Sequence, residues 1–412
     1  MNETKKNTFF LIGEHLTHSF SPAIHAYLAP YRYGLKELPP EELATFLTSG
    51  EFDGLNVTIP YKQAVIPYLK ALSPIAERIG AVNTVIRRED GTLYGDNTDY
   101  QGLTFTLTDM GLCPKGKKVL VLGSGGASRM ACALLFDLGA REVVVISRKG
   151  ENHYGNLEKH EDAEIIVNTT PVGMYPKNGE APLSLARFSR LEGVVDLIYN
   201  PAKTALLLEA EALGIPAKNG LSMLVAQAHR AAELFLGTTL DKEKIPAITK
   251  ALEKQMQNVV LIGMPGCGKT TLGRLLAPCL GKRFVDADEE VVKRAGKPIP
   301  QIFAEEGEGA FRRLESEVLK DLGKQTGLLI ATGGGAVTVA ENYAALKQNA
   351  TVIFLDKSPE LLAKEGRPLS QRKTPQELYE ERLPLYRRFA DVTVPLVHDI
   401  DLDLAHLKEM LQ

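Results

Sequence analysis

The fold of the C-terminal part is decided by the stretch Val259-Val260-Leu261-Ile262-Gly263-Met264-Pro265-Gly266-Cys267-Gly268-Lys269-Thr270. Its apolar start predicts a buried strand, and the G-x-x-x-x-G-K-T pattern that follows is typical of a phosphate-binding loop that leads into a helix. In such a loop Lys269 reaches the β- and γ-phosphates of a triphosphate, and Thr270 ligates Mg²⁺. The expected triphosphate-binding residues are Gly263, Gly266, Cys267, Gly268, Lys269, Thr270 and Thr271.

A second glycine-rich loop lies earlier in the chain. The segment Gly123-Ser124-Gly125-Gly126-Ala127-Ser128 follows the apolar run Val119–Leu122 and is a variant of G-x-G-x-x-G, with Ser128 in the third position. A strand before it and a helix after it indicate a site for the pyrophosphate of a dinucleotide.

The end of the next expected strand selects between two dinucleotides. It reads Ser147-Arg148-Lys149, where an NAD site would place Asp or Glu against the ribose 2′-OH. Two cations favour a 2′-phosphate, so we expect NADPH/NADP+ to bind at the loop and at Arg148 and Lys149. The alternative is a pair of solvated surface cations.

Length and composition are those of a multidomain globular protein. The chain has 412 residues, 44% hydrophobic and 24% charged, so two or three domains are expected. A net charge of −3 gives no sign of nucleic-acid binding, and no apolar run is long enough to cross a membrane. The cysteines form no C-x-x-C pair and no metal-ligand spacing, and no secretory signal precedes the first apolar strand. We therefore expect free thiols in a reducing compartment and a cytoplasmic protein.

Apolar strand-like runs alternate with helical patterns, which predicts α/β domains with largely parallel sheets. The first expected strands are Phe9–Gly13, Gly34–Leu38, Gly54–Thr58, Ala81–Arg87, Lys118–Leu122, Glu142–Ile146, Glu164–Asn168 and Gly193–Asp196. The second series is Asn258–Gly263, Arg283–Asp286, Leu328–Ala331, Thr351–Leu355 and Val392–Pro395. Asp241–Gln257 predicts a connecting helix, and Leu221–Leu236 predicts an apolar helix that packs against the N-terminal part. The Gly-, Asn- and His-rich stretch Arg148–Ala163 predicts a loop or a short helix.

The first half of the chain contains several different short polar motifs. They are His18-Ser19-Phe20-Ser21-Pro22, Asn56-Val57-Thr58-Ile59-Pro60-Tyr61-Lys62, Gly80-Ala81-Val82-Asn83-Thr84, Gly95-Asp96-Asn97-Thr98-Asp99, Asn168–Met174, and Met223 with Gln227. In this order they resemble the shikimate dehydrogenase family over residues 8–236. The resemblance implies that Lys62 and Asp99 form a catalytic pair. It also implies substrate binding by Ser19 and Ser21 at the carboxylate, by Asn56, Thr58, Asn83, Asp99 and Gln227 at the hydroxyls, and by Tyr199 nearby.

The chemistry of these residues agrees with that resemblance. Hydride delivery to a ketone builds negative charge on oxygen, and a lysine ammonium held by a carboxylate can donate the proton there. The alternatives are a solvated surface Lys62 and a pair, Ser19 and Ser21, that only caps the helix beginning near Pro22.

A second ordered set follows the phosphate-binding loop. It consists of Phe284–Asp288, Phe311-Arg312-Arg313 with Glu315, Gly333-Gly334-Gly335, Arg367-Pro368-Leu369 and Arg382–Tyr386. The set resembles shikimate kinase over residues 258–397. The resemblance implies the following roles: Asp286 near Mg²⁺, Asp288 at the attacking hydroxyl, Arg367 as a lid cation at the transferring phosphoryl group, Arg312 and Arg382 at the acceptor carboxylate, and Gly334 and Gly335 at its ring.

Arginine pairs suit this acceptor, because they grip a carboxylate bidentately while an acidic side chain orients the nucleophilic hydroxyl. The alternatives are a solvated strand end for the aspartates and ordinary helix-surface charge for the arginines. The lid, Pro359–Arg367, is shorter than is typical of the family, and Lys364 is the closest candidate for a cation beside the adenine.

Together the motifs predict a bifunctional enzyme. Its expected parts are an α/β substrate domain (1–100, completed by helix 221–236), a Rossmann-type NADP domain (101–220), a helical linker (237–257) and a P-loop kinase α/β/α domain with a parallel sheet (258–412). It would reduce 3-dehydroshikimate to shikimate with NADPH and then phosphorylate shikimate with ATP and Mg²⁺, two consecutive steps toward aromatic amino acids. Its partners would be these small molecules, with no nucleic acid or membrane.

Two alternatives remain open at this stage. The first half could be an NAD-linked quinate or shikimate dehydrogenase. The whole chain could instead be a non-catalytic sensor of pathway intermediates, although a sensor has no need for both Lys62 and Lys269.

Overall fold

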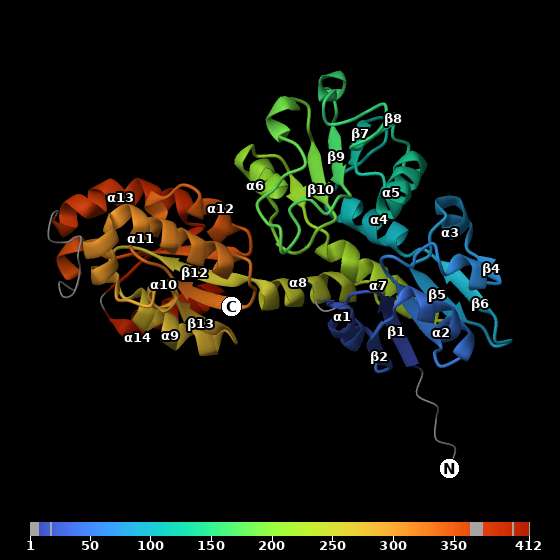
Figure 1. Ribbon diagram of the computed structural model, residues 1–412, viewed down its shortest axis with the longest axis horizontal. Helices are drawn as coiled ribbons and strands as arrows, with labels where there is room; N and C mark the ends of the chain where they lie inside the picture. Colours follow the sequence, from blue (N-terminus) through green and yellow to red (C-terminus); the bar gives the residue numbers. More distant parts are fainter. Residues whose placement is uncertain (1–7, 17–18, 363–373, 398, 412) are drawn as a thin grey trace, which may run out of the picture. The chain divides into compact units, whose positions relative to one another are not determined.

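The computed structural model describes residues 8–16, 19–362, 374–397 and 399–411. The chain divides into two compact units, whose elements are labelled in Figure 1. The first comprises Met1–Pro171, Pro182–Tyr199 and Glu209–Leu252, and the second comprises Val172–Ala181, Asn200–Leu208 and Glu253–Gln412. The four parts expected from the sequence are a finer division, which stays a prediction.

The first unit contains a six-stranded sheet with the order β2-β1-β3-β5-β6-β4. Its strands are β1 (Thr8–Gly13), β2 (Arg32–Glu37), β3 (Gly54–Val57), β4 (Ala71–Leu72), β5 (Thr84–Arg87) and β6 (Leu93–Asp96). Strands β1, β2 and β3 are parallel, but β5 runs antiparallel to both β3 and β6. The largely parallel pairing expected from the sequence therefore has an exception at this edge. A tight turn, closed by the bond from Arg88 N to Thr92 O, joins β5 to β6 and leaves no room for the crossover that parallel strands need.

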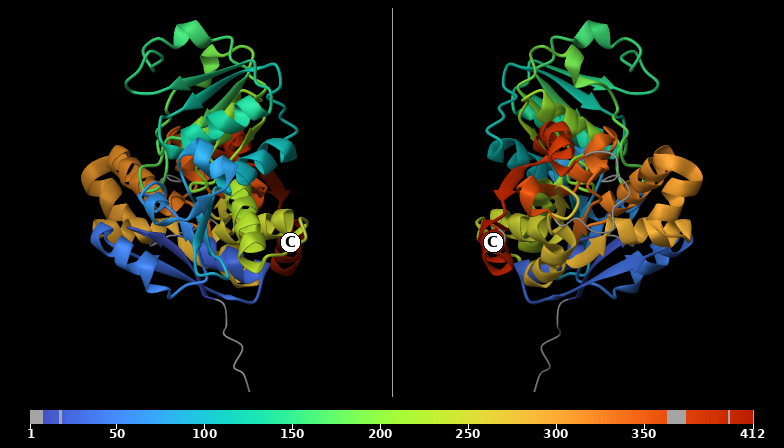
Figure 2. Two further views of the ribbon diagram at one scale, coloured as in Figure 1. Left: turned by 90° about the vertical axis from the view of Figure 1, so that its right-hand side faces the viewer. Right: turned by 90° about the vertical axis from the view of Figure 1, so that its left-hand side faces the viewer.

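Two helices cover one face of this sheet, as Figures 1 and 2 show: α1 (Ser21–Leu28) and α7 (Leu221–Leu236). Phe235 of α7 stacks on Phe9 of β1 with ring centroids 4.4 Å apart. A Cβ added at Gly54 would lie 2.8 Å from the Phe235 ring, so glycine is required there for the helix to approach. The expected packing of helix 221–236 against the N-terminal part is confirmed. The unit also contains α2 (Leu43–Ser49), α3 (Pro74–Ile79) and α4 (Asp99–Asp109).

A second sheet, with the order β11-β10-β9-β7-β8, is parallel throughout. Its strands are β7 (Lys118–Leu122), β8 (Glu142–Ile146), β9 (Ile165–Asn168), β10 (Gly193–Asp196) and β11 (Ala217–Lys218), with helices α5 (Gly126–Asp137) and α6 (Ala205–Ala212) along the chain. Between β8 and β9 the chain forms only a short 3-10 helix, η3 (Leu157–His160), which confirms the expected loop or short helix.

Helix α8 (Lys244–Met256) forms where a connecting helix was expected and leads to the third sheet. That sheet has the order β13-β14-β12-β15-β16 and is parallel throughout. Its strands are β12 (Asn258–Ile262), β13 (Arg283–Asp286), β14 (Leu328–Ala331), β15 (Ala350–Asp356) and β16 (Val392–Pro395). Its helices are α9 (Lys269–Cys279), α10 (Ala287–Ala295), α11 (Ile299–Gly323), α12 (Asn342–Lys347), α13 (Pro375–Phe389) and α14 (Ile400–Leu411).

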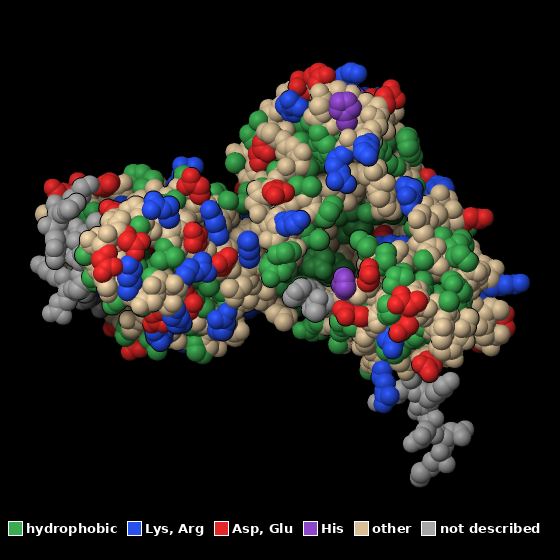
Figure 3. All heavy atoms as spheres, in the orientation of Figure 1, with side chains coloured by type: hydrophobic (Ala, Val, Ile, Leu, Met, Phe, Trp, Pro, Cys, Tyr) green, Lys and Arg blue, Asp and Glu red, His purple; other side chains and the backbone are tan. Residues whose placement is uncertain are grey.

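The surface carries charges of both signs. On the face shown in Figure 3, Lys and Arg side chains are interspersed with Asp and Glu rather than gathered in one basic area. Among the residues that the structure describes, no helix combines the length and the apolar character needed to cross a membrane.

Candidate active sites

The first candidate site is built around Lys62 and Asp99. Lys62 follows β3, whereas Asp99 begins α4, and Lys62 Nζ lies 2.6 Å from Asp99 Oδ2. The second oxygen, Asp99 Oδ1, accepts a hydrogen bond from Asn83 Nδ2 at 2.9 Å. Two donors therefore fix the buried carboxylate, while 28% of the Lys62 side chain stays exposed and can reach a ligand.

Asn83 links this pair to helix α7. Its side-chain nitrogen donates to Gln227 Oε1 at 2.9 Å as well as to Asp99, so both amide hydrogens are engaged. Its side-chain oxygen accepts from Thr98 N at 2.7 Å. Since Asn83 is only 2% exposed, these contacts lock the orientations of the aspartate and the glutamine beside the lysine.

The predicted carboxylate-binding serines lie at the start of α1. Ser19 Oγ accepts a hydrogen bond from Ser21 N at 3.2 Å, and Phe20 between them packs edge-on against Tyr199, with centroids 6.0 Å apart. The helix begins at Ser21 itself, and its N-cap, Phe20, makes no side-chain cap. The alternative that Ser21 caps the helix is therefore wrong, although the Ser19 hydroxyl accepts a hydrogen bond from one amide of the first turn.

The predicted hydroxyl-binding residues Asn56 and Thr58 come from the end of β3. Asn56 Nδ2 lies 3.2 Å from Thr84 Oγ1 and 3.4 Å from Asn83 O, which joins this segment to the network around Asp99. Thr58 N donates to Ile12 O at 2.9 Å. The structure thus gathers the residues predicted for one substrate into a single unit.

The glycine-rich loop after β7 is shaped for close approach of a ligand. Gly123 adopts φ 106°, and a Cβ there would meet Thr169 Oγ1 at 2.8 Å. Gly125, the N-cap of α5, has no side-chain cap, and a Cβ added there would meet nothing within 4 Å. The amides of the first turn of α5, which includes Ala127 and Ser128, fit the pyrophosphate of a dinucleotide.

The cations predicted for the 2′-phosphate lie beside that loop. Gly123 N donates to Ile146 O at 2.8 Å, which joins the start of the loop to the end of β8. Arg148 and Lys149 follow Ser147, the first residue after β8, and both are exposed. Ser147 Oγ donates to Lys149 O at 2.5 Å and closes the turn that presents them. These residues fit NADP better than NAD because no carboxylate lies at this strand end.

The second candidate site begins at the phosphate-binding loop between β12 and α9. Lys269 Nζ donates to Gly263 O and Met264 O at 2.9 Å each, so the ammonium lies across the inside of the loop. Gly266 and Gly268 adopt φ values of 80° and 107°, which only glycine takes without strain. The uncapped first turn of α9, with Thr271 exposed, completes a cradle that fits a triphosphate.

A candidate Mg²⁺ position lies beside this loop, where Thr270 Oγ1 donates to Asp286 Oδ2 at 2.7 Å. No group of three or more His, Cys, Asp or Glu side chains placed to hold a metal occurs in the described part of the chain. One hydroxyl and one carboxylate still fit Mg²⁺, which takes its other ligands from phosphates and water.

Two buried carboxyl groups meet over the glycine loop after β14. A Cβ added at Gly333 would lie 2.4 Å from Glu315 Oε1 and 2.8 Å from Asp288 Oδ1. Both oxygens are buried without a hydrogen-bond partner among the described residues. Burial raises the pKa of each carboxyl, and the nearby Asp286 raises the pKa of Asp288 further. Glu315 Oε2 also holds Arg312 Nη1 at 2.6 Å.

The two predicted carboxylate-binding arginines contact the same loop. Arg382 Nη1 donates to Gly334 O at 3.1 Å, and a Cβ added at Gly335 would lie 2.1 Å from Arg312 Nη2. The buried Nε atoms of both arginines lack a partner in the described structure. Two donors and two carboxyl acceptors therefore converge here, which fits a small ligand that carries both a carboxylate and hydroxyl groups.

Sequence reasoning gave no role to two members of this site, Glu315 and Tyr386, although both stand in the quoted motifs. Tyr386 OH donates to Gly334 O at 2.5 Å. The signal for Glu315 was its spacing of three residues after Arg312, which places both on one helical face. The predicted lid residue Arg367 and the candidate Lys364 lie outside the described residues.

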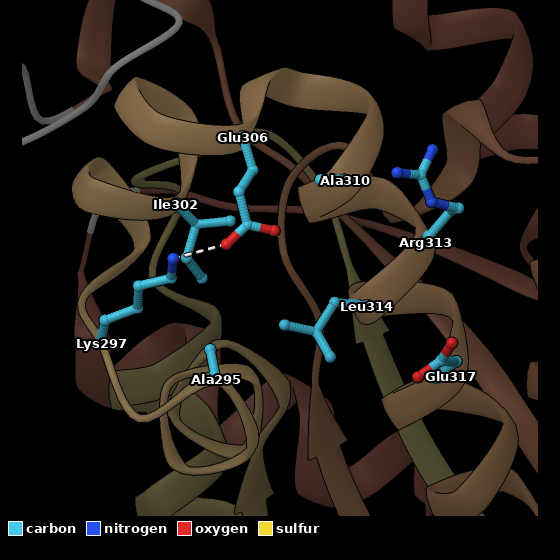
Figure 4. Close-up of a pocket in the computed structure, with 8 residues that line it drawn as sticks. All are labelled: Ala295, Lys297, Ile302, Glu306, Ala310, Arg313, Leu314 and Glu317. Carbon is cyan, nitrogen blue, oxygen red and sulfur yellow. Dashed lines mark ion pairs between the residues drawn. The ribbon is translucent and has the colours of Figure 1, made fainter.

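A separate hollow lies between α10 and α11 (Figure 4). Its α11 side chains, among them Ala310, Arg313 and Glu317, follow helical spacing on a different face from Arg312 and Glu315. Lys297 at its rim pairs with Glu305 and Glu306. The hollow is therefore not part of the acceptor site.

Comparisons with known proteins relate the two parts of the chain to two enzyme families. Residues 11–85 match the model of the shikimate dehydrogenase substrate binding domain, and residues 265–410 match that of shikimate kinase. A shikimate dehydrogenase (NADP(+)) of Clostridium beijerinckii is 34% identical over 266 residues, which cover 60% of this chain and 98% of the relative.

Solved structures give the same result for the dehydrogenase part of the chain. Shikimate dehydrogenase 1 of Peptoclostridium difficile matches with a TM-score of 0.55 and 37% identity, over 60% of this chain and 98% of that one. A shikimate 5-dehydrogenase of Thermus thermophilus, in complex with NADP(H) and shikimate, matches with a TM-score of 0.55 and 35% identity, over 60% and 99%.

Proposed function

Because this chain belongs to the shikimate dehydrogenase family and carries a shikimate kinase domain at its C-terminus, we propose that the two clusters described above are its two active sites. The chain is a bifunctional enzyme of the shikimate pathway, an NADP-dependent oxidoreductase fused to a kinase. The product of its first reaction, shikimate, is the substrate of its second.

The contact between Lys62 and Asp99 carries the assignment of the first site. When 3-dehydroshikimate is reduced, negative charge develops on the ketone oxygen, and the Lys62 ammonium is placed to donate the proton there. Asp99, fixed by Asn83, holds the ammonium in position and accepts from a substrate hydroxyl. NADPH, held by the loop at Gly123 and by the cations after β8, supplies the hydride.

Substrate selection at the first site follows from the other side chains of the network. The hydroxyl groups of Ser19 and Ser21 suit the carboxylate of the substrate. Asn56, Thr58, Asn83 and Gln227 offer amide and hydroxyl groups to its ring hydroxyls. Tyr199, whose pKa is raised by burial, stays protonated and closes the site beside Phe20.

The glycine loop at Gly333–Gly335 carries the assignment of the second site. Arg312 and Arg382 grip the shikimate carboxylate, and Asp288 accepts the hydrogen of the attacking hydroxyl. Lys269 neutralises charge that develops on the transferring group. ATP supplies that phosphoryl group, and Thr270 and Asp286 would hold Mg²⁺, which would supply positive charge beside the phosphate oxygens. The lid role of Arg367 belongs to the same proposal.

The domain limits expected from the sequence, with a helical linker over 237–257, are also part of the proposal, and the formation of α8 supports them. A cytoplasmic location is proposed as well. It is supported by Cys113, Cys132, Cys267 and Cys279, which are all free thiols.

One assay tests the whole assignment. The purified chain is given 3-dehydroshikimate, ATP and Mg²⁺, with or without NADPH, while NADPH loss and ADP formation are followed. ADP should appear only when NADPH is present, because the acceptor must first be made. Added shikimate should restore ADP formation without NADPH. If added shikimate gave no ADP, the kinase assignment would be contradicted. If NADPH were not oxidised, the dehydrogenase assignment would be contradicted.

A Lys269→Met variant separates the two sites in the same assay. It should slow ADP formation by about a hundredfold or more, because the lysine stabilises charge on the transferring group, while NADPH oxidation continues unchanged. Normal ADP release by this variant would show that another group stabilises the charge on the transferring phosphoryl group.

A further inference from the structure

Tyr33 of β2 reaches across β1 to Asn56, a proposed substrate residue at β3. Tyr33 pairs in register with Phe9 of β1, and Phe9 pairs with Gly54, two residues before Asn56. Because side chains alternate along a strand, these residues point to the same face, the one that α1 and α7 cover. Tyr33 OH donates to Asn56 Oδ1 at 2.8 Å.

The phenol of Tyr33 is held rigidly in this position. Its ring stacks on the ring of His25, with centroids 3.7 Å apart and an angle of 10° between the planes. His25 Nδ1 lies 2.6 Å from Tyr31 OH, and burial lowers the pKa of His25 to about 3. The imidazole is therefore neutral near pH 7, supports the phenol ring by stacking, and also hydrogen-bonds the Asn56 side chain.

The Ser21 side chain lies close enough to the same phenol to affect its pKa. Burial raises the pKa of Tyr33 well above its usual value, and a hydrogen bond from the Ser21 side chain opposes that rise. Tyr33 therefore stays protonated and lies between Ser21, which is assigned to the substrate carboxylate, and Asn56, which is assigned to a substrate hydroxyl.

This geometry decides how Asn56 is presented. An asparagine amide can face a ligand with either its oxygen or its nitrogen. Since the phenol donates to Oδ1, the nitrogen must face Thr84 Oγ1 and Asn83 O, as observed. Removing the phenol would take away one of the contacts that fix the amide and would leave Ser21 without its neighbour.

We propose that Tyr33 is a positioning residue of the dehydrogenase site, which fixes Asn56 and Ser21 so that both ends of 3-dehydroshikimate are recognised together. The proposal rests on the proposed substrate roles of Ser21 and Asn56. It gives Tyr33 a role in substrate recognition and none in hydride or proton transfer, because Lys62 and Asp99 are held by other contacts.

The test compares Tyr33→Phe with Tyr31→Phe in the full chain. Tyr31 contacts the same histidine and has no bond to Asn56, so it is a matched control. Tyr33→Phe should raise the KM for 3-dehydroshikimate about three- to tenfold, the effect of one hydrogen bond, with kcat changed less than about twofold. The KM for NADPH and the melting temperature should match those of the control, and Tyr31→Phe should leave the KM for 3-dehydroshikimate unchanged.

Asn56→Ala and the double variant separate this inference from the proposed function. Asn56→Ala should raise the same KM, and adding Tyr33→Phe to it should have little further effect, because the two residues act as one unit. A raised KM in Asn56→Ala with an unchanged KM in Tyr33→Phe would overturn the inference and leave the substrate role of Asn56 intact. An unchanged KM in Asn56→Ala would overturn that role and the inference together. A fall in kcat in Tyr33→Phe, together with a melting temperature below that of Tyr31→Phe, would show that Tyr33 is only structural.

Discussion

The Lys62 ammonium lies 2.6 Å from the Asp99 carboxylate, although 37 residues separate them in the chain. Lys62 follows the end of β3, and Asp99 opens α4 directly after the antiparallel pair of β5 and β6. Strand β5 lies between β3 and β6 and is antiparallel to both, so β3 and β6 run in the same direction. The C-terminal ends of β3 and β6 therefore lie at the same edge of the sheet, which brings the segments that follow them together.

Lys62→Ala should lower kcat for NADPH-dependent reduction about a hundredfold or more, because a positioned proton donor contributes ~10²–10⁴ to the rate. Phosphorylation of added shikimate by the same sample should stay normal, which also controls for protein quality. Loss of both activities would mean that Lys62 is structural, and retention of both would remove it from the mechanism.

Replacing both Arg148 and Lys149 by Ala should raise the KM for NADPH about tenfold or more, because charge-assisted hydrogen bonds to a phosphate contribute ~1.5–3 kcal/mol each. NADH has no 2′-phosphate, so its rate should hardly change. The measurement is the ratio of kcat/KM for the two cofactors. Equal losses with NADPH and NADH would rule out the 2′-phosphate assignment.

The hydrophobic pattern and the turn residues between the apolar runs were enough to predict most of the sheet strands, because buried parallel strands have continuous apolar sequences. Lys118–Leu122 and Glu142–Ile146 are confirmed to the residue. The missed strands β4, β6 and β11 are short, and β6 contains Gly and Asp, which have low strand propensity. Their pairing is set by neighbouring strands rather than by local pattern.

In the candidate sites, too, local sequence motifs do not predict contacts that depend on packing between distant segments. Motifs identified Lys62, Asp288 and Arg312, because such residues stand in recognisable segments. Nothing in the sequence indicated that Tyr33 would reach Asn56, since that contact depends on register across three strands. The close approach of Glu315 and Asp288 over Gly333 is likewise a property of packing between a helix and a loop.

His25 should make the first unit sensitive to acid. Its pKa in the folded protein is about 3, below the 6.5 of an unfolded chain, so between these values only the unfolded chain binds the proton. Stability should therefore fall as the pH drops below about 6.5, by at most ~1.4 kcal/mol per pH unit from this residue. His25→Gln stays neutral and should lose less stability between about pH 7.5 and 5.5. The urea midpoint for loss of dehydrogenase activity measures this. Equal acid losses in the two proteins would contradict the prediction.

Gly335→Ala should selectively weaken binding of the phosphoryl acceptor. The added Cβ would lie 2.1 Å from Arg312 Nη2 and 2.4 Å from Arg312 Cζ, so the guanidinium must move away from the glycine loop. The backbone itself tolerates alanine, because φ is −103°. A displaced arginine no longer grips the shikimate carboxylate, so the KM for shikimate should rise about tenfold or more, while the KM for ATP changes little.

Gly309→Ala is the matched control, because it lies in the same helix as Arg312 and its added Cβ would meet only Arg313 Nη1, at 3.7 Å. Alanine is the better helix former by about 1 kcal/mol, so this variant should keep its kinase activity and melt at the same or a higher temperature. Dehydrogenase activity should be normal in both variants. If Gly335→Ala bound shikimate normally, Arg312 could not be the residue that holds the carboxylate, and Arg382 would have to hold it alone.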